Sequence, residues 1–150
     1  MQSLQQKIEP ILAQVTQWAS MDVNIIALAL VGSYAKGDFR FDSDIDLMFL
    51  TPDPLIFKNS QTWIKEIDWQ YLDLTIKAWE DINYGVVWSR HIYFTNQTEI
   101  EFSFGFLSWA SINPLEIGTF RVVNNGCRIL YDPKCLLQNL LHEVKSISQK

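Results

Sequence analysis

Two aspartates separated by a single residue form the pair in this chain whose spacing most clearly indicates chemistry. Asp44 and Asp46 flank Ile45, and the apolar residues 47–50 follow them, which predicts a buried strand over residues 44–50. Side chains two positions apart on a strand point to the same face. Two ionised carboxylates held side by side repel each other unless a cation lies between them. This aspartate pair therefore predicts a site for a hard divalent ion, and Mg2+ fits its oxygen ligands.

A glycine and a serine precede the aspartate pair. Gly32 and Ser33 come at the end of the apolar run 25–31, which has the length of a buried strand and is too short to span a membrane. Glycine lets a ligand approach the backbone closely, and a serine hydroxyl with free N–H groups at the start of a helical turn suits phosphate oxygens. We interpret these two residues as a phosphate loop.

The connection between the two predicted strands determines how they meet. Residues 34–43 are too few for the crossover that a parallel pair requires, so we expect the strands to run antiparallel. The end of the first strand then lies beside the start of the second. The phosphate loop comes next to the aspartate pair, where a triphosphate on the loop would share a metal ion with the carboxylates.

These residues together resemble the signature of the DNA polymerase beta-type nucleotidyltransferase superfamily. Gly-Ser is followed by residues 34–43 and then by Asp-Ile-Asp-Leu. The minimal nucleotidyltransferases and the nucleotidyltransferase domains of aminoglycoside-modifying enzymes share a Gly-Ser-x-Ala-x-Gly loop, which this chain matches at Gly32, Ser33, Ala35 and Gly37. Such relatives often carry arginine where this chain has Tyr34 and Lys36.

The resemblance implies a fold and a reaction. The implied fold is α/β (α+β), with a mixed, mostly antiparallel sheet flanked by helices, in a single nucleotidyltransferase domain over residues 1–150. The implied reaction transfers a nucleoside monophosphate from a nucleoside triphosphate to an acceptor hydroxyl and releases pyrophosphate. ATP would donate AMP, and another nucleoside triphosphate would donate its own monophosphate. Two Mg2+ ions would organise it. Asp44 and Asp46 would hold both ions as catalytic residues, and a third carboxylate on a later strand would join them at the ion nearest the acceptor.

The third carboxylate should stand between apolar residues on a strand, and two glutamates compete for this role. Ile100-Glu101-Phe102 fits that setting best. Glu99 lies nearer the predicted turn, where a solvated role explains it, so we favour Glu101 as the third metal ligand.

Two cations near the loop are candidates for neutralising phosphate charge. Lys36 and Arg40 lie within the connection between the two strands. A role as solvated surface cations explains both residues equally well.

The remaining pattern predicts the elements that position these groups. Residues 86–94 and 99–106 read as two strands of a hairpin joined by the polar residues 95–98. Asn125-Gly126 predicts a tight turn between two short strands, over 122–123 and 127–130. Further predictions are helices over residues 4–18, 60–67 and 136–144 and a strand over residues 72–79.

Composition limits the partners and the compartment. The chain has 150 residues, about one domain, and a net charge of −5 with twelve scattered basic residues, which argues against an extended nucleic-acid surface. The first residues lack the continuous apolar segment of a secretory signal, and we expect a cytoplasmic protein that crosses no membrane. Cys127 and Cys135 form no zinc-binding or paired motif and should be reduced thiols.

The acceptor is the least determined part of the prediction. Drug-modifying relatives usually append a helical domain, for which residues 54–90 are the one insertion-sized candidate, so we lean toward a partner protein or self-association as a homo-oligomer. An aminoglycoside-type acceptor and a non-catalytic nucleotide-binding module stay open as alternatives.

Overall fold

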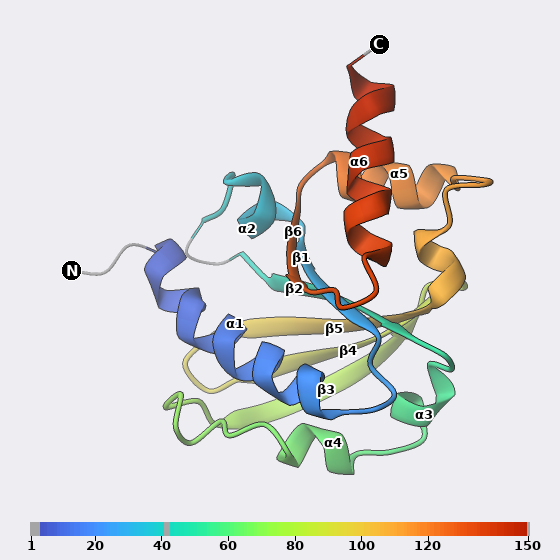
Figure 1. Ribbon diagram of the computed structural model, residues 1–150. Coiled ribbons are helices and arrows are strands. Elements are labelled where there is room, and N and C mark those ends of the chain that lie inside the picture. Colours follow the sequence, from blue (N-terminus) through green and yellow to red (C-terminus); the bar gives the residue numbers. More distant parts are fainter. Residues whose placement is uncertain (1–3, 41–42, 150) are drawn as a thin grey trace.

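A six-stranded sheet in the order β3-β4-β5-β2-β1-β6 organises the protein (Figure 1). The computed structural model describes residues 4–40 and 43–149, with the side chains of residues 4–6 outside the description. Strands β2 and β5 run parallel, and every other neighbouring pair in this sheet is antiparallel, which confirms the predicted mixed sheet. The strands are β1 (Ala27–Val31), β2 (Ile45–Thr51), β3 (Ile76–Asn83), β4 (Val87–Phe94), β5 (Glu99–Phe106) and β6 (Cys127–Tyr131).

Helices lie on both faces of the sheet. On one face, α1, α3 and α4 pack against the strands, and on the other α5, α6 and a short 3-10 helix gather over one part (Figure 1). None of the described helices is long and apolar enough to cross a bilayer. The helices are α1 (Leu4–Met21), α2 (Ser33–Lys36), α3 (Leu55–Lys58), α4 (Thr62–Lys65), α5 (Ile117–Asn124), α6 (Leu136–Ser148) and the 3-10 helix (Leu107–Ala110).

The first face of the sheet is packed with aromatic side chains. The Phe104 ring stacks on Phe49 with ring centroids 4.9 Å apart and on Phe57 with centroids 4.5 Å apart. Trp18 from α1 and Trp63 from α4 complete this cluster. Such rings bury large apolar areas and dominate core energetics. The core therefore accounts for these tryptophans, and alternation along β2 and β5 turns the carboxylates to the opposite face.

That opposite face is only partly covered. Met48 and Leu50 of β2 pack with Leu137 and Leu140 of α6 in a second apolar cluster. Asp46 lies two residues before Met48 on the same face and is only partly buried. The cover of α5 and α6 therefore ends where the carboxylates begin.

A buried arginine fixes which way β4 faces. Arg90 is 2% exposed, and its guanidinium bonds both carboxylate oxygens of Asp81 while donating to the carbonyl oxygen of Ser60. A buried charge requires such complete pairing. Because Arg90 faces the helices α3 and α4, its neighbour His91 faces the carboxylates.

One predicted element is wrong, and another begins later than predicted. Residues 122–124 belong to α5 instead of a strand, since Val123 is buried in the cluster with α6. Gly126 follows the end of this helix, so the Asn-Gly signal marks a helix terminus here. The predicted strand over residues 72–79 begins only at Ile76, because residues 70–73 form a turn.

Candidate active site

The phosphate loop and the aspartate pair meet as the antiparallel prediction requires. Val31, the last residue of β1, is paired with Asp46 of β2. Gly32 follows with φ +79°, a backbone conformation that favours glycine. A Cβ at this position would overlap the Oδ2 atom of Asp46. Glycine is therefore required here both by its backbone angle and by the space that the carboxylate occupies.

The single turn of α2, which follows the phosphate loop, packs against the connection between α5 and β6. The Lys36 N–H donates to the Gly32 carbonyl oxygen at 3.0 Å, which closes the single turn of α2. A Cβ added to Gly126 would lie 2.7 Å from the Lys36 nitrogen and 3.1 Å from the Ala35 carbonyl carbon. The backbone of Gly126 thus packs directly against α2 and sets the position of the phosphate loop.

The parallel β2–β5 ladder places four carboxylates side by side. Asp46 is paired with Glu101, and Ile45 with Ile100, so Asp44 lies next to Glu99. Each of the four is partly buried. The three carboxylates that we predicted as metal ligands are brought together, and Glu99 lies with them rather than in solvent beyond the turn.

A histidine that sequence reasoning did not select lies among these carboxylates. His91 of β4 is paired with Glu101 of β5. Its Nε2 atom lies 2.8 Å from Glu99 Oε1 and 4.0 Å from Asp44 Oδ2, and its Nδ1 atom lies 3.7 Å from Glu101 Oε1. The ring is buried and stacks on Tyr93 with centroids 4.7 Å apart.

A tyrosine also reaches the site from the β3–β4 turn. The Tyr84 hydroxyl donates a 3.0 Å hydrogen bond to Glu101 Oε1, although the residue is 56% exposed. No sequence pattern distinguished Tyr84, because only the strand pairing brings this residue close to Glu101.

The electrostatics of Asp46 show why a cation suits this cluster. Burial and the negative charges of Glu101 and Asp44 raise the pKa of Asp46 to about 7, against the opposing effect of His91. A divalent ion between the carboxylates reverses that repulsion and favours the ionised form. The donor set of clustered carboxylate oxygens therefore fits divalent metal ions.

The two candidate cations lie at the edge of the site. The side chains of Lys36, at the end of α2, and Arg40 are exposed. The Arg40 backbone N–H donates to Ser43 Oγ at 2.7 Å, directly before Asp44. Their proposed role with phosphate stays a prediction.

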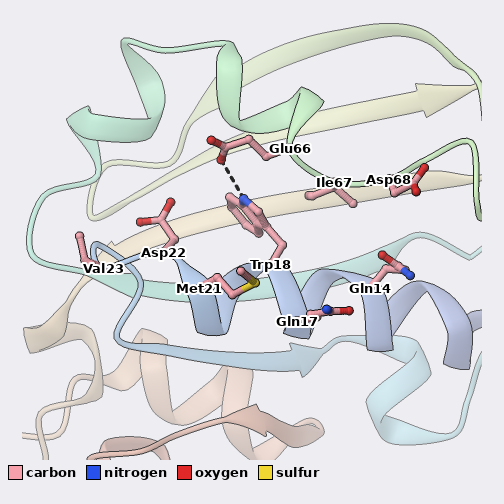
Figure 2. Close-up of a pocket in the computed structure, with 9 residues that line it drawn as sticks. All are labelled: Gln14, Gln17, Trp18, Met21, Asp22, Val23, Glu66, Ile67 and Asp68. Atoms are coloured by element: carbon pink, nitrogen blue, oxygen red, sulfur yellow. Dashed lines mark hydrogen bonds between the residues drawn. The ribbon is translucent and has the colours of Figure 1, made fainter.

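A separate hollow of about 530 Å³ lies between α1 and the segment after α4 (Figure 2). Trp18 lies in it and donates through Nε1 to Glu66 at 3.0 Å. Because Trp18 packs on Phe49, this hollow opens on the face of the sheet that α1 covers. It contains none of the predicted site residues and is not the centre described above.

The sequence also matches a known family over the part of the chain that carries the site. The profile of the nucleotidyltransferase domain family matches residues 13–101, more than half of the chain, from α1 to Glu101. The chain belongs to the nucleotidyltransferase domain family. The predicted resemblance and the nucleotidyltransferase type of the domain are thereby confirmed.

Solved structures similar to this nucleotidyltransferase domain are distant in sequence. An aminoglycoside 6-adenyltransferase from Bacillus subtilis matches with a TM-score of 0.47 and 14% identity over 73% of this chain and 37% of that chain. A toxin-antitoxin structure with AMP-PNP matches with a TM-score of 0.45 and 13% identity, over 92% of this chain and 86% of that one. The present chain thus spans little more than a third of the adenyltransferase. No curated protein matches the sequence.

Proposed function

We propose that this domain transfers a nucleoside monophosphate, AMP from ATP, to a hydroxyl group of an acceptor and releases pyrophosphate. The observation that carries the proposal is the contact of one carboxylate with two groups. Asp46 lies against the backbone of Gly32 on one side and beside Glu101 on the other. A triphosphate on the loop and an acceptor near Glu101 would thus adjoin the same aspartate.

Asp44, Asp46 and Glu101 would hold two Mg2+ ions in this reaction. When bound, such ions neutralise phosphate charge, lower the pKa of the acceptor hydroxyl and stabilise an in-line displacement. The chain contributes a preformed cluster, because two paired strands, β2 and β5, hold the carboxylates before any ion arrives. Its charges repel one another in the absence of metal, as the raised pKa of Asp46 indicates.

The loop residues would bind and orient the nucleotide. The absence of a side chain at Gly32 lets the Asp46 carboxylate lie against the loop backbone, so a phosphate bound on the loop would adjoin the metal ligands. The Ser33 hydroxyl would donate to a phosphate oxygen, and Lys36 and Arg40 would offset phosphate charge from the exposed edge.

Exposed side chains at the end of the strands that carry His91 and Glu101 favour a macromolecular acceptor, either a partner protein or a second copy of the chain. Tyr84, which contacts Glu101, is 56% exposed, and its neighbour Val86 is 79% exposed. Phe106 is 50% exposed and lines the same hollow as Val86. Val86 and Phe106 lie at the end of the β4–β5 pair away from Glu101, and exposed apolar side chains gathered in one hollow favour contact with another macromolecule over a small hydrophilic drug.

Labelled ATP tests the transfer and identifies the acceptor class together. The protein is incubated with α-phosphate-labelled ATP and Mg2+, alone, with lysate of its source cells, and with a panel of aminoglycosides. We expect label on a protein band in the first or second mixture. Label on a drug and on no protein would overturn the choice of acceptor but keep the transferase.

A non-catalytic nucleotide-binding module is the alternative that calorimetry can separate. Binding of MgATP without pyrophosphate release in any mixture would establish that module instead of an enzyme. Absence of MgATP binding would remove the phosphate loop from the proposal as well.

A further inference from the structure

The imidazole of His91 separates the four carboxylates into two pairs. Asp46 and Glu101 are paired on the ladder, and Asp46 adjoins the phosphate loop. Asp44 and Glu99 instead approach the Nε2 atom of His91, at 4.0 and 2.8 Å. The second group therefore combines two carboxylate oxygens with one imidazole nitrogen.

The three side chains are arranged as ligands of a single ion. One atom each from Asp44, His91 and Glu99 lie within 4.8 Å of one another. The residues come from separate segments: the residue before β2, the middle of β4 and the start of β5. Three protein ligands leave further coordination positions for water or substrate, as in catalytic metal sites.

The opposite edge of the ring faces a carboxylate, at a distance longer than a hydrogen bond. Histidine ligands usually donate their second N–H to a carboxylate, which orients the ring. Nδ1 of His91 lies 3.7 Å from Glu101 Oε1. Burial and stacking on Tyr93 hold the ring in this orientation. Nε2 therefore points to Asp44 and Glu99 while Nδ1 is turned to Glu101.

We propose that Asp44, His91 and Glu99 bind a divalent first-row transition-metal ion, for which Mn2+ is the probe, beside the Asp46–Glu101 pair. This inference rests on the proposed function, because Asp44 is also one of the proposed Mg2+ ligands of the transfer reaction. Imidazole nitrogen favours transition metals, whereas Mg2+ prefers oxygen ligands alone. The site thus takes Mn2+ in preference to Mg2+, and Glu99 acts as a metal ligand rather than a solvated turn residue.

Pulsed electron paramagnetic resonance of bound Mn2+ tests this directly. The chain has two histidines, so replacing one leaves the other as the sole source of an imidazole signal. An imidazole ligand produces a nitrogen-14 modulation of the Mn2+ echo. The protein is used without an affinity tag and without nucleotide, whose base nitrogens would add their own couplings. In His142→Asn, an exposed position on α6, the remaining histidine is His91. We expect the modulation in the parent and in this variant.

His91→Asn is the matched variant at the site. It should lose the nitrogen modulation and bind Mn2+ about tenfold more weakly or worse, since even outer-shell changes cost about 10–100-fold in metal affinity. Its Mg2+ affinity should change less. Circular dichroism checks its fold, and the His142→Asn measurement decides the proposal even if His91→Asn does not fold.

The outcomes separate this inference from the proposed function. Absence of nitrogen modulation in His142→Asn, or its persistence in folded His91→Asn, would overturn the His91 ligand. Pyrophosphate release with MgATP, measured on the same samples, tests the transferase independently. Nitrogen coupling without transfer would refute the proposed function alone, and transfer without nitrogen coupling would refute this inference alone.

Discussion

Asp46 and Glu101 are directly paired residues of the parallel β2–β5 ladder, although they lie 55 positions apart in the sequence. The pairing puts both carboxylates on the face that α5 and α6 leave partly open. The backbone of Gly32 closes the other side of Asp46. One aspartate therefore connects the predicted phosphate loop with the predicted third acid, and its substitution is the most informative single change.

Asp46→Asn should abolish nucleotidyl transfer while the fold is retained. The amide has the size of the carboxylate but removes the charge that would hold the metal ions. We expect a loss in rate beyond the roughly 10–100-fold that typically follows the loss of an outer-shell partner. Pyrophosphate release measures it, with circular dichroism as the control for folding. Near-native turnover would refute the two-metal assignment.

The metal-free protein should lose stability as the pH rises from about 4 to 7. Folding raises the pKa of Asp46 from 3.8 to about 7 through burial and the charges of Glu101 and Asp44. The stabilisation from this proton is complete below the unfolded pKa and is lost as the pH rises through the folded pKa. Urea unfolding in EDTA should show it, and Asp46→Asn should lack this component, with a difference on the order of a few kcal/mol at pH 8. An identical pH profile for the variant would contradict the prediction.

The two strands that meet at the aspartate pair could be predicted because their signals are local. Apolar runs of strand length and a short connection require an antiparallel pair, and β1 and β2 form it with Val31 opposite Asp46. The α1 and α6 helices likewise follow from apolar periodicity, which buries Leu12 and Val15 in one and Leu140 in the other.

His91 could not be placed from the sequence because its position depends on hairpin register. A four-residue turn over residues 95–98 would put His91 opposite Phe102. The Phe94 N–H instead donates to the Thr98 carbonyl oxygen, and His91 is paired with Glu101. A shift of one residue reverses the face of every side chain on a strand. The core packing of β4, and Arg90 above all, selects the observed register.

Glu101→Gln and Glu99→Gln should fail in different ways. Glu101→Gln should bind MgATP nearly normally but transfer more slowly by orders of magnitude, because Asp44 and Asp46 still hold the ion on the triphosphate. Glu99→Gln should weaken Mn2+ binding, so its rate should recover at high Mn2+. Rates titrated with Mn2+ distinguish the two variants. Recovery of Glu101→Gln but not of Glu99→Gln would reverse their roles.

Gly126→Ala should weaken nucleotide binding from outside the site. The new methyl group would press on the α2 backbone, 2.7 Å from the Lys36 nitrogen. The phosphate loop must then shift by some tenths of an ångström or more. Gly85→Ala is the control, because Gly85 also has positive φ but faces open space. MgATP affinity, measured by calorimetry, should fall in Gly126→Ala alone. If the two variants bind MgATP equally well, the contact of Gly126 with α2 has no role in nucleotide binding.

Gly32→Ala tests whether the close approach of the loop to Asp46 is the basis of nucleotide binding. Gly37→Ala is its matched control, since Gly37 has φ +85° and nothing within 4 Å of an added Cβ, whereas Gly32 has φ +79° and would drive its Cβ into the Asp46 carboxylate. Gly37 has ψ 11°, in the left-handed region where alanine costs roughly 1–2 kcal/mol, whereas Gly32 has ψ −157°, in a region that is essentially limited to glycine, so Gly32→Ala bears the larger backbone strain. Only Gly32→Ala should also displace Asp46, so it should lose both MgATP affinity and transfer while Gly37→Ala keeps most of each. Thermal melts measure the strain of each variant, and calorimetry with a pyrophosphate assay measures the differences in binding and transfer. If the two variants bind and react alike, backbone strain alone explains the need for glycine, and the contact with Asp46 has no part in binding.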